Sequence, residues 1–190
     1  MIVYHGTSSR NLESILAGGL TPGVDSSNWE VLARTGNLPT KRLVYVTNRD
    51  PLHFSVNSCW DGTDGIIFKL DIDEKNLCPD VDFLGLIRRE LVKRGVKPPV
   101  VPMLGLEDGL IAAREHGVLS LQKCGLAAHL GAIEKERILS HARIDFKARH
   151  SMLDLHLKEH SGQLSPDLFF NEEEFRKRKH IDPLGITFGS

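Results

Sequence analysis

Two short segments of the sequence carry side chains that suit a nicotinamide nucleotide. His5 and Gly6 follow an apolar start, and Tyr45 lies within the β-branched run Leu43–Thr47. A histidine at a strand end can donate a ring N–H to a sugar hydroxyl, and a glycine lets the backbone approach a planar amide. A tyrosine offers a flat face on which a cationic ring stacks. These groups suit nicotinamide and its ribose, although a core histidine, a turn glycine and a core tyrosine also account for them.

Five segments of the chain occur in an informative order. They are residues 4–8, 12–20, 44–47, 65–71 and 128–138. In order and spacing they resemble the ADP-ribosyltransferase superfamily, in the branch of diphtheria toxin, the poly(ADP-ribose) polymerases and the rifampin-modifying transferases. The similarity covers residues 1–23, 43–82 and 119–144, about half of the chain.

The resemblance implies a fold, a co-substrate and a reaction. The fold is a split pair of antiparallel sheets with NAD in the cleft between them. His5 would contact a ribose of NAD, Gly6 and Thr7 would line the nicotinamide site, and Tyr45 would stack on the ring. Nicotinamide would leave, and a nucleophile of a protein or nucleic-acid target would attack the oxocarbenium-like ribose carbon. We therefore expect an NAD-dependent mono-ADP-ribosyltransferase, such as a bacterial or phage effector or toxin.

A second wall of the nicotinamide site is expected just after Tyr45. Phe54 and Ser55 follow this tyrosine by about two helical turns, which would bring an aromatic ring back to the same site. An ordinary core phenylalanine on a buried helix face explains Phe54 equally well.

The third catalytic position departs from the family. Its usual glutamate would fall near His129, while Glu134 and Glu136 lie a few residues later and resemble the ExE arrangement of a different branch. Gln122 lies before the expected strand and is a further candidate. A solvated turn also accounts for the two glutamates. Without the glutamate, chain elongation is doubtful, and a catalytically inactive NAD-binding module stays open as an alternative.

Two other constellations suggest different chemistry. His156 and His160, with Glu159, match an HxxEH zinc-peptidase pattern, but a third ligand is missing and we expect no metal site. An RNA 2'-phosphotransferase-like enzyme would use a pair of arginines on phosphate. Its candidate arginines, which no motif places, are Arg10, Arg34 and Arg42.

A basic run occupies residues 88–97, with five positive residues and one negative. It suits nucleic-acid phosphates or an acidic protein target. A solvated outer face opposite Leu84, Ile87 and Leu91 explains the same residues.

The composition excludes several classes of protein. The 190 residues are 41% hydrophobic and 26% charged with a net charge of −1, so bulk charge indicates no polyanionic partner. No apolar run is long enough to span a membrane, and the start lacks a secretion signal. Three cysteines without a CxxC pattern favour a cytoplasmic location. Five of the nine histidines lie in the last 50 residues, which predicts a C-terminal surface that becomes basic as pH falls through about 6.5.

The pattern of elements favours an α+β fold. We expect an ADP-ribosyltransferase-like domain over 1–146 with a helical insertion at 83–118, and a charged, histidine-rich helical extension over 147–190. Strands are expected up to residue 4, at 43–47 and 65–72, from 119 onward and at 138–146. Helices are expected at 10–17, 51–58, from 82, at 107–116, 150–160 and 171–179, with a long loop at 21–42.

Overall fold

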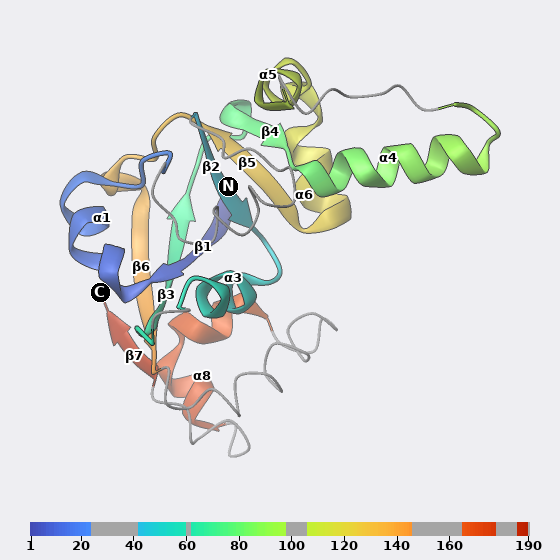
Figure 1. Cartoon of the computed structure of the whole chain (residues 1–190). Helices are drawn as coiled ribbons and strands as arrows, with labels where there is room; N and C mark the ends of the chain where they lie inside the picture. The colour runs from blue at the N-terminus through green and yellow to red at the C-terminus, as the bar shows by residue number, and fades with distance from the viewer. Residues whose placement is uncertain (24–41, 60–61, 98–105, 146–164, 178–185, 190) are drawn as a thin grey trace. The chain divides into compact units, whose positions relative to one another are not determined.

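The computed structural model describes residues 1–23, 42–59, 62–97, 106–145, 165–177 and 186–189 (Figure 1). The chain forms two compact units. Unit 1 comprises residues 1–20, 47–72 and 133–190, and unit 2 comprises residues 21–46 and 73–132. Each unit therefore combines segments that are far apart in the sequence. The predicted division at residue 146 stays a prediction.

Unit 1 is built on an antiparallel sheet. Its described strands run in the order β1 (Ile2–Ser8), β3 (Gly65–Asp71), β6 (Ile138–Ile144) and β7 (Ile186–Gly189). β1 pairs with β3 along its whole length. With β2 it pairs at one position, where Tyr4 lies opposite Thr47. The described helices of this unit are η1 (Ser9–Asn11), α1 (Leu12–Gly18), α3 (Pro51–Asn57), η4 (Lys135–Arg137), η6 (Pro166–Phe170) and α8 (Glu172–Lys177).

The two faces of this sheet differ because successive strand residues point to opposite sides. On one face, residues of β1, β3 and β6 pack against α3, η6 and α8. This core cluster contains Tyr4, Leu52, Ile67, Ala142, Ile144, Leu168, Phe169 and Phe175. The opposite face carries His5, which pairs across β1 and β3 with Phe68, and Phe68 pairs in turn with His141 on β6.

Unit 2 has three described strands and a core cluster of its own. Its strands run in the order β4 (Leu77–Pro79), β5 (Leu126–Leu130) and β2 (Leu43–Thr47), whose last residue belongs to unit 1. The described helices are η2 (Glu74–Asn76), α4 (Val81–Lys93), α5 (Leu106–Ala112), η3 (Arg114–His116) and α6 (Gly117–Cys124). Leu43, Cys78, Leu110 and Ala128 form the core cluster.

Much of the expected element pattern is confirmed. The fold is α+β, and strands at 43–47 and 65–71 and the helix at 51–57 lie where the sequence predicts them. The first strand extends beyond residue 4 to Ser8, because β3 pairs with it that far. The first helix begins at Leu12, after a 3-10 turn capped by the Ser8 side chain.

One predicted strand is wrong. The segment from Leu119 is not a strand; residues 117–124 form α6, and β5 begins only at Leu126. Gly125, with φ of 77°, ends the helix in the left-handed conformation that favours glycine. Gly117, Ser120 and Leu121 on this helix are buried, a helical spacing that the apolar run alone did not reveal.

Several expectations concern the ends of the chain and the linkers. The expected loop at 21–42 and helix at 150–160 lie largely or wholly outside the described residues. The C-terminal segment contributes α8, as expected, and also β7, which the sequence did not indicate. Within the described residues, no helix is both long and apolar enough to cross a membrane.

Candidate functional site

His5 is half-buried near the middle of β1. It lies in one row with Phe68 and His141, which occupy matching positions on the next two strands of the same face. The rings of Phe68 and His141 are tilted, with centroids 6.0 Å apart. Burial lowers the pKa of His141, and Glu13 partly offsets that shift. The structure thus brings a second histidine onto the face of His5, which only the strand register could reveal.

Gly6 faces the opposite side, directly under helix α3. A Cβ at Gly6 would lie 2.4 Å from the Pro51 carbonyl oxygen and 2.4 Å from the Ser55 nitrogen. These atoms are backbone, so they cannot rotate away. Gly6 is therefore required by the close approach of α3 to β1, whatever else its backbone binds.

The predicted second wall divides into two different environments. Phe54 is half-buried, and its ring makes an edge contact with His53 at 5.3 Å between centroids. Ser55 is 0% exposed, and a Cβ at Gly65 would fall 2.1 Å from its hydroxyl oxygen. Ser55 thus packs inside unit 1 where Gly6 and Gly65 leave room for it, and this burial does not favour the predicted contact with a cofactor.

Thr7 is engaged in the turn that leads to α1. Its hydroxyl oxygen accepts a hydrogen bond from the Asn11 side-chain amide at 3.0 Å, and the residue is buried. Thr7 therefore fixes the chain after β1 rather than presenting a free hydroxyl.

Tyr45 belongs to β2 in unit 2. It is half-buried and packs against the core cluster that includes Leu43 and Ala128. Part of its ring therefore has an apolar setting, and the rest is exposed to a ligand or solvent.

His129 lies on β5, where it pairs with Leu77. Ala128 belongs to the cluster that Tyr45 contacts, and successive strand residues alternate, so His129 faces the other side of this sheet. Its Nδ1 lies 3.2 Å from the Gly131 carbonyl oxygen, to which it donates in the matching tautomer. Burial lowers its pKa, and Gly131 and Asp73 partly oppose the shift. His129 therefore faces away from Tyr45, and its burial disfavours the charged form of the ring.

Glu134 and Glu136 lie at the turn that precedes β6, in unit 1. Both are exposed, and Glu134 precedes η4 without capping it through its side chain. Neither forms an ion pair with a described residue, so both carboxylates are accessible. Gln122, the further candidate, is exposed on α6, four residues before β5 begins.

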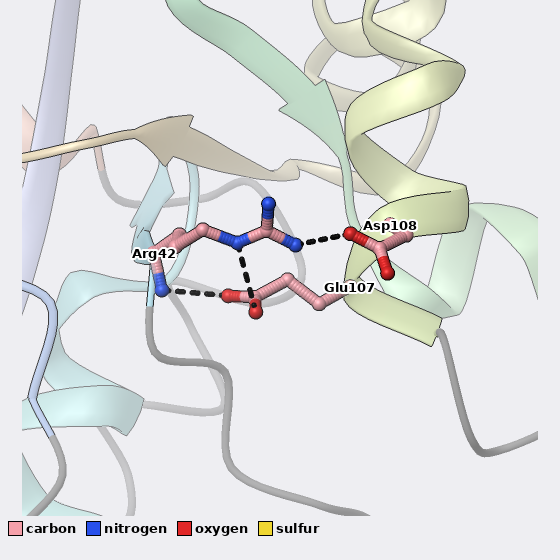
Figure 2. A network of polar contacts seen from close by, with 3 residues as sticks. All are labelled: Arg42, Glu107 and Asp108. Carbon is pink, nitrogen blue, oxygen red and sulfur yellow. Dashed lines mark hydrogen bonds and ion pairs between the residues drawn. The ribbon is translucent and has the colours of Figure 1, made fainter.

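Arg42 is already occupied by two carboxylates. Figure 2 shows its backbone N–H donating to Glu107 at 2.6 Å, its Nε donating to Glu107 at 3.2 Å, and its Nη2 donating to Asp108. These contacts fasten the start of β2 to α5. Of the other arginines suggested for a phosphotransferase, Arg10 is exposed on η1 and Arg34 lies outside the described residues. Arg42 is therefore poorly suited to bind a phosphate.

The zinc-peptidase residues His156 and His160 lie outside the described residues. In the part of the chain that the structure describes, no group of three or more His, Cys, Asp or Glu side chains could hold a metal ion.

Comparisons with known proteins give little further information. No family model matches the sequence, and no curated protein matches it. Among solved structures, the chain is similar to a protein described as EcPltA, with 14% identity, 75% of each chain covered and a TM-score of 0.39. A likeness at this level identifies neither a family nor a function.

Proposed function

We propose that the chain is an NAD-dependent mono-ADP-ribosyltransferase that modifies a macromolecule, with the split antiparallel sheets and NAD cleft of that superfamily. The observation that carries the proposal is the position of the His-Gly pair on β1. This strand pairs with β3 from Ile2 to Ser8, but its register with β2 is limited to Tyr4 with Thr47. Gly6 lies two residues past that pair, where the strand edge is suited to hydrogen-bond an amide.

The proposed roles follow the chemistry of each group. His5 donates a ring N–H to a ribose hydroxyl, the Gly6 backbone holds the carboxamide, and Tyr45 stacks on the nicotinamide ring. Phe54, half-buried beside His53 on α3, is proposed as a second aromatic contact. Thr7 contributes by fixing the turn after β1.

The substrate supplies a strained, cationic glycosidic bond. When that C–N bond breaks, its electron pair leaves with neutral nicotinamide, and positive charge develops at the ribose carbon. The target nucleophile forms the new bond with its own lone pair and releases its proton to solvent. The protein accelerates this reaction by orienting the substrate and stabilising the developing charge.

Three residues are candidates for the third catalytic position: His129, Glu134 and Glu136. The glutamates are exposed, and so suit a group that orients a nucleophile of a large target, whereas His129 is buried and its pKa is lowered by that burial. We propose one of the glutamates for this role. Glu134→Gln and Glu136→Gln should each leave the melting temperature unchanged, and one of them should lower the transfer rate at least tenfold. If only His129→Asn lowers the rate without lowering the melting temperature, the glutamates are excluded.

The function is tested with NAD labelled in its adenylate moiety. The full chain is incubated with this NAD and a cell lysate, and label bound to protein and to nucleic acid is counted separately. We expect transfer by the wild type, loss of transfer in His5→Ala and Tyr45→Ala, and substantial retention in Tyr45→Phe, which keeps the stacking ring. His116→Ala, at an exposed histidine of η3, is the matched control and should transfer normally.

Two outcomes would contradict the proposal. Thermal stabilisation by NAD without transfer would identify a catalytically inactive NAD-binding module. Transfer that persists in both His5→Ala and Tyr45→Ala would show that the site lies elsewhere.

A further inference from the structure

Helix α4 ends in an exposed basic surface that the proposed reaction does not use. We define this α4 basic surface by five residues, all of them exposed: Arg88, Arg89, Lys93, Arg94 and Lys97. Residues 81–97 also hold two acidic residues, Asp82 and Glu90, so this segment has a net charge of +3 in a chain whose net charge is −1. Positive charge is thus concentrated on one helix.

Most of this charge is not neutralised by the residues that the structure describes. Lys93 pairs with Glu90 at 2.7 Å, and this pair, helped by Arg94 and Arg89, lowers the pKa of Glu90. Arg88, Arg89, Arg94 and Lys97 form no ion pair with any described residue. This differs from α8, where Arg176 and Lys177 are each paired with a glutamate one turn earlier.

The basic residues extend along α4 over a length that matches several phosphates of a nucleic-acid strand. Arg88 to Arg94 spans about 9 Å at 1.5 Å per residue, comparable with two to three phosphates at about 3.4 Å of axial rise per strand. Arg89 and Lys93, one turn apart, lie on the side of α4 away from Phe83 and Leu84. Arg88 lies one turn after Leu84 and is also exposed. Arg94 and Lys97 extend the array beyond the helix end.

The apolar residues between these charges are small. Val92 is 58% exposed and Val96 50% exposed, and Ile87, which the sequence suggested as buried, is 38% exposed. No aromatic residue lies between Gly85 and Lys97. Protein interfaces are anchored by buried aromatic side chains, and membrane-binding helices by a broad apolar face. Phosphate-backbone binding needs neither.

We propose that the α4 basic surface binds nucleic acid through its phosphates, without reading sequence. Three of the five residues are arginines, whose planar guanidinium groups donate two parallel hydrogen bonds to a phosphate. This binding is independent of the proposed transfer reaction, and its test needs no NAD.

The test measures binding of the full chain to fluorescent single-stranded DNA and RNA of the same mixed sequence, by anisotropy between about 50 and 200 mM salt. The triple variant R88Q/R89Q/R94Q removes three charges. The matched control K123Q/K135Q/R137Q removes three exposed charges elsewhere. Circular dichroism and melting temperature verify that both variants fold.

We expect wild-type affinity to fall as salt rises, with a log–log slope of about −3.5 for about five contacts at ~0.7 each. The triple variant should bind at least tenfold more weakly, and the magnitude of its salt slope should be smaller by about 2. The affinity of the control variant should stay within twofold of that of the wild type. Equal binding by the folded triple variant and the wild type would overturn the proposal. So would no binding by the wild type at low salt, or equal affinity for poly-glutamate of matched charge, which would indicate an acidic protein partner.

Discussion

Gly6 shows how a residue proposed to bind a ligand can also be fixed by packing. The backbone of α3 occupies the space where a Cβ would lie, at 2.4 Å from two backbone atoms. We predict that Gly6→Ala lowers the free energy of unfolding of unit 1 by about 1–3 kcal/mol, the usual cost of overpacking. Urea unfolding followed by circular dichroism measures this.

Gly18→Ala is the matched control for that change. Gly18 is the last residue of α1, and no atom lies within 4 Å of a Cβ built there. Its replacement should leave stability unchanged or raise it by up to about 1 kcal/mol, because alanine is the better helix former. If Gly6→Ala and Gly18→Ala behave alike, α3 does not approach β1 as described.

At this scale the sequence identified candidates but not their surroundings. The His5-Gly6 pair and Tyr45 could be selected from residue types and from the resemblance. The burial of Ser55 and the pairing of Arg42 with Glu107 and Asp108 could not, because each depends on a segment distant in the sequence.

The start of α4 depends on a buried carboxylate. The Asp80 side chain caps the helix by accepting from the Asp82 N–H at 2.8 Å, and Asp80 is 7% exposed. Burial raises its pKa to about 6, although the hydrogen bond from Asp82 opposes the shift. The raised pKa means that the folded state binds the proton more tightly than the unfolded chain. The contribution of Asp80 to stability therefore falls as pH rises from about 4 to about 6 and is then constant.

We predict that Asp80→Asn removes this loss. Asparagine caps a helix as well as aspartate does, so the variant should be more stable than the wild type at pH 7, by at most about 3 kcal/mol for a shift of roughly two units. The difference should vanish near pH 4. Urea unfolding at both pH values measures it, with the exposed Asp82→Asn as control. A stability difference between Asp80→Asn and the wild type that is the same at pH 4 and pH 7 would contradict the assignment.

Among the elements, the helices and strands whose ends or composition are marked by characteristic residues could be predicted. Asp50-Pro51 marks the start of α3, and the β-branched run marks β2. The segment before Gly125 was predicted as a strand but forms a helix, because a short apolar run fits either a strand or a buried helix. The exposed Ile87 on α4 shows the same limit, since burial depends on which elements pack against a helix.

At the scale of the molecule, the C-terminal segment belongs to the core of unit 1. Leu168 and Phe169 of η6 and Phe175 of α8 lie in the same cluster as Tyr4. Asp167 accepts hydrogen bonds from Tyr4 at 2.8 Å and from Lys69 at 2.6 Å, which joins η6 to β1 and β3. The sequence indicated a charged helical tail, and neither these long-range contacts nor β7 could be inferred from local pattern.

We predict that Phe169→Ala destabilises unit 1 by about 3–5 kcal/mol, because it removes a fully buried ring and leaves a cavity. The control is Phe170→Ala. Its ring is only half-buried and stacks on Tyr4 at 5.7 Å, so its loss should cost clearly less. The melting temperatures of the two variants make the comparison. A loss for Phe169→Ala no larger than that for Phe170→Ala would show that η6 does not pack in the core.

The central claim is that this chain breaks the glycosidic bond of NAD. The most direct measurement is the nicotinamide released when the purified full chain is incubated with NAD and lysate, quantified by chromatography for the wild type, His5→Ala and His116→Ala. We predict release by the wild type and His116→Ala, and at least a tenfold slower release by His5→Ala. No nicotinamide above the level of the lysate alone, or equal release by folded His5→Ala, would contradict it.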